Sequence, residues 1–156
     1  MHGTLPQPVL DYPHESTRTA LDMVMSGTKR EYPDCKVILS HAGGSLPFLL
    51  TRAAQLVSRL PPHVNNTKSA DKTIEDAKSC YFDLALAMSP EILDTLLKHF
   101  PVDRLLFESD MPYAQEGSVI AFSGRMDGYL LGEDLRQKLA FENAIELFPR
   151  LKGLKQ

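Results

Sequence analysis

The stretch KVILSHAGGS, residues 36–45, decides the fold. Its first five residues form a short apolar run with β-branched members between turn formers, which predicts a buried strand over 36–40. The two glycines that follow allow a sharp turn, because glycine has no Cβ to restrict φ. Ser45 then begins a run with apolar residues at helical spacing, and we predict a helix that ends at Pro61 and Pro62.

The same order of strand and helix occurs twice more along the chain. We expect strands over 80–85 and 104–107, and helices over 90–100, 118–129 and 133–148. Such alternation is typical of an α/β protein whose parallel strands are joined by right-handed crossovers.

Two further segments are polar or rich in proline. The first fifteen residues contain three prolines, and we interpret them as a loop because proline fixes φ and removes a donor. We expect a helix after this loop, with Ser16 or Thr17 as its N-cap. Residues 61–79 are polar, which predicts an exposed excursion with a short helix near 71–78.

Composition and charge exclude several classes of protein. The 156 residues suit one domain over 1–156, and a hydrophobic fraction of 43% is too high for a disordered chain. A net charge of −3 argues against a nucleic-acid partner held by a basic surface. No apolar run is long enough to span a membrane, and the first residues lack the pattern of a signal peptide. Cys35 and Cys80 form no motif and fit buried residues of a reducing compartment, so we expect a cytoplasmic protein.

Two residues fit for chemistry follow two of the predicted strands. His41 comes directly after the first strand, and Asp110 follows the third. In parallel α/β folds, ligands bind at the C-terminal ends of the strands. Imidazole and carboxylate together suit zinc or another divalent ion. The alternative is structural, because a histidine at a strand end can be a hydrogen-bonded surface group and an aspartate can cap a turn or helix.

Four segments together resemble a known family. They read SHAGGSLPFLLTRAA (40–54), YFDLAL (81–86), RLLFESDMPYA (104–114) and ENAIELF (142–148). They are similar to the C-terminal half of the amidohydrolase-related metal-dependent decarboxylases, the group of aminocarboxymuconate-semialdehyde decarboxylase and its aromatic relatives. Residues 13–48 most resemble the fungal 6-methylsalicylate decarboxylases of that family. The likeness extends from about residue 2 to residue 150.

This resemblance implies a partial TIM (β/α)8 barrel, roughly strands five to eight, with a divalent metal at its C-terminal rim. Zinc is the metal we expect first, with manganese as the alternative. Asp110 matches the metal-binding aspartate, His2 the metal-binding histidine after the fifth strand, and His41 the histidine after the sixth strand that works on water or substrate. Arg52 matches an arginine that some members lend across a dimer interface to a substrate carboxylate. His14 lies near the predicted rim, where it could contact the substrate.

The chain also departs from the family pattern. No HxH pair occurs in the 156 residues, so we expect the chain to correspond to the C-terminal half of the barrel and to bind metal weakly. A half barrel exposes sheet edges and apolar interior, which favours association. Glu108 stands where the family usually has a small residue. Because strand side chains alternate, Glu108 should face the same way as Asp110, either supporting the site or as a charge tolerated in a wet interior.

Three functional hypotheses follow. The leading one is the C-terminal portion of a carboxy-lyase that decarboxylates, without oxidation, an aromatic or unsaturated carboxylic acid such as 6-methylsalicylate. In this hypothesis Asp110 carries the proton to the ring carbon. His41 forms a hydrogen bond with the substrate or activates water, and Arg52 binds a substrate carboxylate in a homodimer. The second hypothesis is a metal-dependent hydrolase on the same scaffold. The third is an inactive half barrel that associates with a partner chain.

Overall fold

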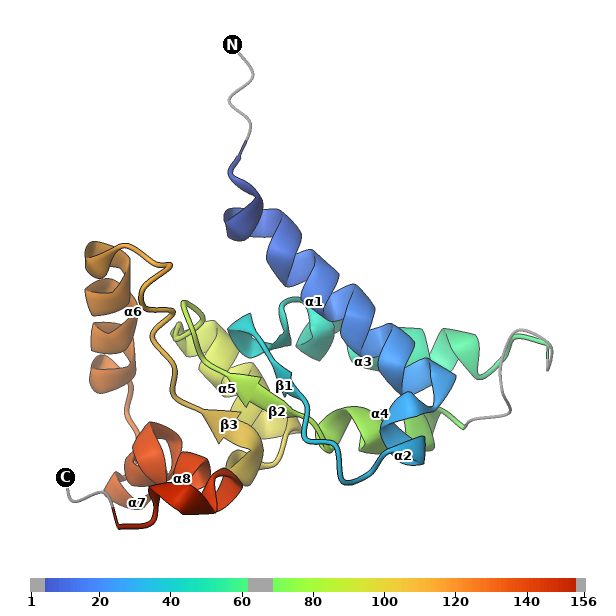
Figure 1. Cartoon of the computed structure of the whole chain (residues 1–156). Helices are drawn as coiled ribbons and strands as arrows, with labels where there is room; N and C mark the ends of the chain where they lie inside the picture. The colour runs from blue at the N-terminus through green and yellow to red at the C-terminus, as the bar shows by residue number, and fades with distance from the viewer. Residues whose placement is uncertain (1–4, 62–68, 154–156) are drawn as a thin grey trace.

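The computed structural model describes residues 5–61 and 69–153 (Figure 1). The strands are β1 (Ile38–Leu39), β2 (Tyr81–Asp83) and β3 (Leu105–Leu106). The helices are α1 (Gln7–Ser26), α2 (Thr28–Glu31), α3 (Leu46–Val57), α4 (Ala70–Lys78), α5 (Pro90–His99), α6 (Glu116–Gly128), α7 (Glu133–Gln137) and α8 (Asn143–Leu147). Short 3-10 turns η1 (His41–Gly43) and η2 (Val102–Arg104) follow β1 and precede β3, and a π-helical turn over Lys138–Glu142 joins α7 to α8.

The three strands form one parallel sheet in the order β1-β2-β3. Chain order equals spatial order, with α3 and α4 between the first two strands and α5 before the third, which confirms the predicted parallel α/β arrangement. Figure 1 shows the sheet at the centre, with α2 and α4 to one side and α6 to α8 to the other. This arrangement is consistent with part of a (β/α)8 barrel.

The register separates the two faces of the sheet. Leu39, Phe82 and Leu105 pair side by side and are almost fully buried. They share one face because side chains alternate along a strand. Ile38 and Asp83 belong to the other face, where Ile38 is 40% exposed. The buried face is continuous with a core that α1, α3, α4 and α5 complete; its members include Val24, Leu46, Leu50, Ala77, Leu93 and Leu96.

The loop expected for the first fifteen residues is wrong from residue 7 onward, because α1 begins at Gln7, and residues 1–4 lie outside the described residues. Pro8 lies in the first turn, where a backbone N–H has no partner to lose. Pro13 lies inside the helix, and packing on the core offsets the hydrogen bond that it cannot donate. The predicted caps Ser16 and Thr17 are therefore interior helix residues.

Helix α1 is seated on the turn that follows β1. The Thr17 hydroxyl lies 3.0 Å from the Pro13 carbonyl oxygen and 3.2 Å from that of Gly43, and it accepts the Ser45 N–H at 2.7 Å. Gly44 has φ +61°, and a Cβ placed there would lie 2.0 Å from the Pro13 oxygen. The backbones of α1 and of this turn are thus in direct contact.

The remaining predicted elements are present with changed bounds. Each strand is shorter than expected because only two or three residues of each pair in register. The predicted helix over 133–148 is interrupted by the π-helical turn. Asn143, at the start of α8, donates from its side chain to the carbonyls of Val102 at 2.7 Å and Leu105 at 2.8 Å, which fastens α8 to β3. Residues 62–68 of the expected excursion lie outside the described residues.

Both cysteines are free thiols. Cys80 is buried as expected, but the same expectation is wrong for Cys35, which is exposed in the turn between α2 and β1. Among the helices that the structure describes, none has the length and apolar character needed to cross a membrane.

Candidate active site

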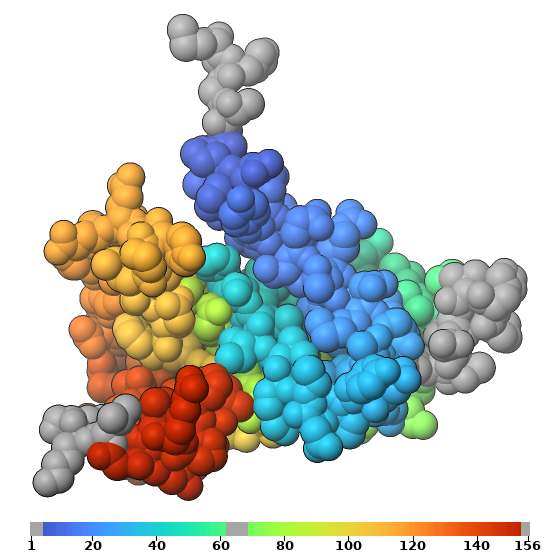
Figure 2. Space-filling view, viewed as in Figure 1, coloured from blue at the N-terminus to red at the C-terminus, as the bar shows by residue number. Residues whose placement is uncertain are grey.

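The C-terminal ends of all three strands meet at one cavity of about 450 Å³. His41 reaches it from the end of β1, Leu86 from beyond β2 and Asp110 from beyond β3. Figure 2 shows the hollow between the N-terminal part of α1 and α6, which supply two of its walls. The lining residues are Pro8, Val9, Pro13, His41, Leu86, Asp110, Tyr113, Ala114, Gln115, Ser118 and Phe122.

The backbone at these three strand ends is left-handed. The φ angles are +53° at His41, +50° at Leu86 and +65° at Asp110. For residues other than glycine this conformation costs about 1–2 kcal/mol each. Such strain persists where the surroundings hold it, and it concentrates at functional sites. Its occurrence at all three strand ends therefore marks the cavity as the candidate active site.

His41 is held at both its backbone and its ring. Its N–H donates to Asp83 Oδ1 at 2.9 Å, and its Nδ1 lies 3.0 Å from the Ala85 carbonyl oxygen. Because a carbonyl oxygen only accepts, Nδ1 carries the proton in this hydrogen bond. In the neutral ring the other nitrogen, Nε2, is then a hydrogen-bond acceptor for whatever occupies the cavity.

Asp110 is held by a carboxylate from its own strand end. Its N–H donates to Glu108 Oε2 at 2.8 Å, and its carbonyl accepts the Ala114 N–H at 2.8 Å. Glu108 is half-buried, so the partner that its charge requires is a backbone amide of the candidate site. This favours the supporting role for Glu108 over that of a tolerated charge.

Asp83 is a third carboxylate near the sheet end, beside Asp110 and Glu108. Burial raises the pKa of its carboxyl group, and the nearby Glu108 adds to this, whereas the N–H groups of His41 and Ala85 oppose it. Sequence reasoning passed over Asp83. The signal was present, because Asp83 ends β2 with a polar side chain after two aromatic residues, much as His41 and Asp110 follow their own strands.

The described residues do not supply a complete metal site. Within residues 5–61 and 69–153, no three His, Cys, Asp or Glu side chains gather closely enough to hold an ion. His2 lies outside the described residues, and the sequence contains no HxH pair. His41 and Asp110 alone therefore do not fit the three or four protein ligands of a divalent ion.

Two other predicted site residues lie away from the cavity lining. His14 is exposed on α1, although its neighbour Pro13 lines the cavity. Arg52 is exposed on α3, close in sequence to the exposed apolar side chains Phe48 and Leu56. Neither residue reaches the cavity of its own chain, so their contacts with a substrate stay predictions.

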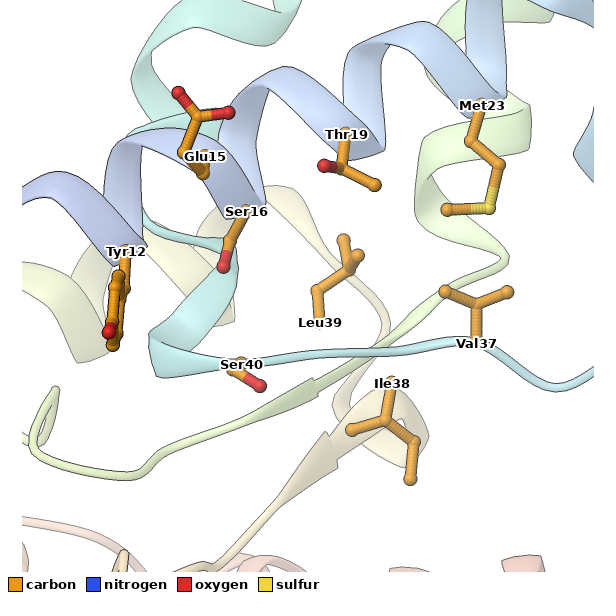
Figure 3. A pocket seen from close by; sticks show the side chains of 9 residues that line it. All are labelled: Tyr12, Glu15, Ser16, Thr19, Met23, Val37, Ile38, Leu39 and Ser40. Carbon is orange, nitrogen blue, oxygen red and sulfur yellow. The ribbon is translucent and has the colours of Figure 1, made fainter. Parts of the chain in front are cut away.

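A second cavity lies between α1 and β1 (Figure 3). This β1–α1 groove has a volume of about 360 Å³, and its lining residues are Tyr12, Glu15, Ser16, Thr19, Met23, Val37, Ile38, Leu39 and Ser40. Figure 3 shows Val37 and Leu39 pointing toward α1 and Ile38 pointing away from it. Among the described residues, β1 is an edge strand, so the groove follows an open edge of the sheet.

A parallel sheet flanked by helices, with polar residues from its strand ends around one cavity, defines an α/β protein and is consistent with part of a (β/α)8 barrel. The amidohydrolase family model matches residues 1–150, and the chain belongs to this family. The resemblance found in the sequence is thereby confirmed.

Two fungal relatives are similar over nearly the whole chain. The 6-methylsalicylic acid decarboxylase of Penicillium expansum is 41% identical over 150 residues, which cover 96% of this chain and 46% of the relative. The 6-methylsalicylic acid decarboxylase of Aspergillus aculeatus is 40% identical over 155 residues, with coverages of 97% and 47%. The chain thus spans about half the length of the relatives that it matches.

A solved structure shares the fold. It is the dihydroxybenzoic acid decarboxylase of a Polaromonas species, crystallised with manganese and the inhibitor 2-nitroresorcinol. Its TM-score is 0.78 at 23% identity, and the match covers 93% of this chain and 42% of that one. At this identity the likeness shows the fold alone.

Proposed function

We propose that this chain forms the C-terminal part of the active site of an enzyme that removes CO₂ from an aromatic or unsaturated carboxylic acid such as 6-methylsalicylic acid. The observation that carries the proposal is the meeting of His41 and Asp110 at one cavity, in a chain 41% identical to a fungal 6-methylsalicylic acid decarboxylase. The cavity volume of about 450 Å³ lies within the usual range for small-molecule sites.

The chemistry assigns a role to each residue. When the carboxylate leaves as CO₂, its bonding electron pair stays with the ring carbon, which must take up a proton. Asp110 is the proton carrier at that carbon, and His41 accepts a hydrogen bond from the substrate through Nε2. The apolar side chains of Val9, Leu86 and Phe122 line the same cavity and suit an aromatic ring.

A divalent metal belongs to this proposal. Manganese in the Polaromonas relative and the imidazole and carboxylate at the cavity support it, with zinc or manganese as the ion. When bound, the metal supplies a Lewis acid for the substrate oxygens. Asp110 and His2 are the proposed ligands from this chain. Because the described residues do not complete the set, we expect weak binding by the chain alone.

Turnover of 6-methylsalicylic acid tests the proposal. The full chain, assayed with added Mn²⁺ or Zn²⁺, should release CO₂ and 3-methylphenol in equal amounts. Asp110→Asn should lower the rate at least about 100-fold, the usual scale of a lost general acid. The matched control is Asp22→Asn, which changes an exposed carboxylate on α1 that does not line the cavity. This variant should leave the rate unchanged. Equal rates for the wild type and Asp110→Asn would contradict the assigned role.

Product analysis separates the proposal from the hydrolase alternative. Decarboxylation incorporates no oxygen from water, whereas hydrolysis of an ester, lactone or amide places one atom of ¹⁸O from labelled water in the acid product. Labelled acid, formed at a rate that depends on Asp110, would favour the hydrolase.

A second candidate function is association with another polypeptide, with or without catalysis. The β1–α1 groove along an open sheet edge supports it, as does the 40% exposure of Ile38. We further propose a homodimer through α3, where Phe48 and Leu56 are exposed on the helix that carries Arg52. Sedimentation of the purified chain tests this association. A monomer at all concentrations would exclude the homodimer.

Two broader expectations remain proposals. One continuous buried cluster links α1 with the later helices, which supports a single domain over residues 1–156. The two free thiols support a cytoplasmic location, because disulfides are rare in reducing compartments.

A further inference from the structure

A single oxygen atom of Asp83 organises the turn on which His41 lies. Oδ1 accepts the N–H of His41 at 2.9 Å and the N–H of Ala85 at 3.2 Å. The Ala85 carbonyl in turn lies 3.0 Å from His41 Nδ1. The carboxylate therefore holds the backbone of His41 directly, and it holds the residue whose carbonyl takes the proton of the ring.

We propose that Asp83 is a positioning residue, which fixes the left-handed backbone and the Nδ1–H tautomer of His41 and so presents Nε2 to the cavity as an acceptor. The catalytic value of this arrangement rests on the proposed function, but the arrangement itself does not.

The conformation of His41 requires such a partner. At φ +53° its backbone is strained, and a strained residue persists only where the surrounding contacts determine it. A carboxylate oxygen that accepts two N–H groups is a strong contact of this kind, because hydrogen bonds to charged groups are stronger than those between neutral ones.

Asp83 acts through His41 and not on a ligand. It does not line the cavity, whereas His41 does. The ring nitrogen of His41 faces a carbonyl and not the carboxylate itself, so Asp83 sets the orientation and tautomer of the ring without a direct ion pair. At functional sites, the hydrogen bond made by one ring nitrogen of a histidine often determines whether the other nitrogen carries a proton.

The choice of variants follows from the geometry. Asp83→Asn keeps an acceptor oxygen for both N–H groups, so it should preserve the tautomer. Asp83→Leu keeps the size of the side chain but removes the acceptor, and Asp83→Ala removes both. Asp76→Ala is the matched control, because Asp76 is a largely buried carboxylate that pairs with Arg30 and does not line the cavity.

The tautomer of His41 can be read directly from ¹H–¹⁵N spectra of the full chain labelled at histidine, with His41→Gln to assign its signals. We expect the Nδ1–H form in the wild type and in Asp83→Asn. In Asp83→Leu and Asp83→Ala the ratio of Nδ1–H to Nε2–H should fall about tenfold, the equivalent of one lost charged hydrogen bond. Asp76→Ala should lower stability without changing that ratio.

Two results would overturn the proposal. One is an unchanged Nδ1–H tautomer in Asp83→Leu, and the other is an Asp83→Asn protein that behaves like Asp83→Leu. Where decarboxylation is measurable, Asp83→Leu should lower kcat more than it changes KM, and Asp83→Asn should restore kcat. A wild-type chain without decarboxylase activity, but with the expected tautomer pattern, would reject the proposed function and leave the role of Asp83 standing.

Discussion

Replacing Gly44 by alanine tests the seating of α1 on the turn that carries His41. The backbone of Gly44 has φ +61° and ψ −122°, outside the regions open to residues with a Cβ. The added Cβ would lie 2.0 Å from the Pro13 oxygen and 2.8 Å from Thr17 Oγ1. The first of these atoms belongs to the backbone of a helix, so relief requires α1 or the turn to move.

Two costs combine in this variant. Holding alanine in a strained backbone conformation costs about 1–3 kcal/mol. Overpacking against an interior contact costs about 1–3 kcal/mol more. The expected loss is therefore about 2–6 kcal/mol, a large part of the 5–15 kcal/mol that stabilises an ordinary domain. With a urea m-value of about 1–3 kcal/mol/M, the unfolding midpoint should fall by about 0.7 M or more.

Urea denaturation followed by circular dichroism measures this loss. The control is Gly124→Ala in α6, where an added Cβ meets no atom within 4 Å. Alanine is the better helix former, so this variant should gain about 0.5–1 kcal/mol. A Gly44→Ala protein whose midpoint equals that of the wild type would refute the close contact between α1 and the turn.

Three further predictions concern other parts of the fold. Asn143→Ala should lower the free energy of unfolding by about 1–3 kcal/mol, because it removes the side-chain donor of the Leu105 carbonyl and leaves the Val102 carbonyl with only the Leu105 N–H; a thermal melt within 1 °C of the wild type would contradict this. In the native protein, Cys35 should react with a thiol reagent at once, whereas Cys80, whose thiol has a pKa raised by burial, should react only on unfolding; equal labelling rates would disprove the difference. Because the pKa of Asp83 is raised in the folded protein, its carboxyl group holds more protons in the native state than in the unfolded state above about pH 4. The free energy of unfolding therefore falls as the pH rises from about 4 through the folded pKa of Asp83. Between pH 4 and pH 8 the free energy of unfolding should therefore decline more steeply in the wild type than in Asp83→Asn. Parallel pH profiles for the two proteins would exclude the raised pKa of Asp83.

The sequence predicts the sheet and the two candidate catalytic residues for one physical reason. A short apolar strand that ends in a polar residue before a turn is a local pattern, and it occurs at both His41 and Asp110. Parallel pairing then brings the two strand ends to one rim, and the structure places both residues at one cavity. Their roles in catalysis stay predictions.

Sequence patterns do not predict the parts of the structure that tertiary packing determines. The prolines at 8 and 13 argue locally for a loop, yet α1 forms because Thr17, Ala20 and Val24 are buried against the core. The walls that α1 and α6 give the cavity could not be predicted, since no local pattern relates Val9 to Phe122. The polar end of β2 marks Asp83 as a candidate, but its role could not be predicted, because its partners are backbone N–H groups that only the tertiary structure brings to it.

The walls of the cavity also bear on the order in which the protein folds. Residues 8–13 of α1 and residues 110–122 close the same cavity, although about a hundred positions separate them in the chain. Contacts between such distant segments require the chain to lose loop-closure entropy before any favourable contact forms. We therefore expect them to form late in folding. The sheet and its helices can therefore assemble as a folding nucleus while the cavity is still open. Ligand-binding capacity should then appear after secondary structure during refolding, and a nascent chain should acquire it only when α6 has been synthesised.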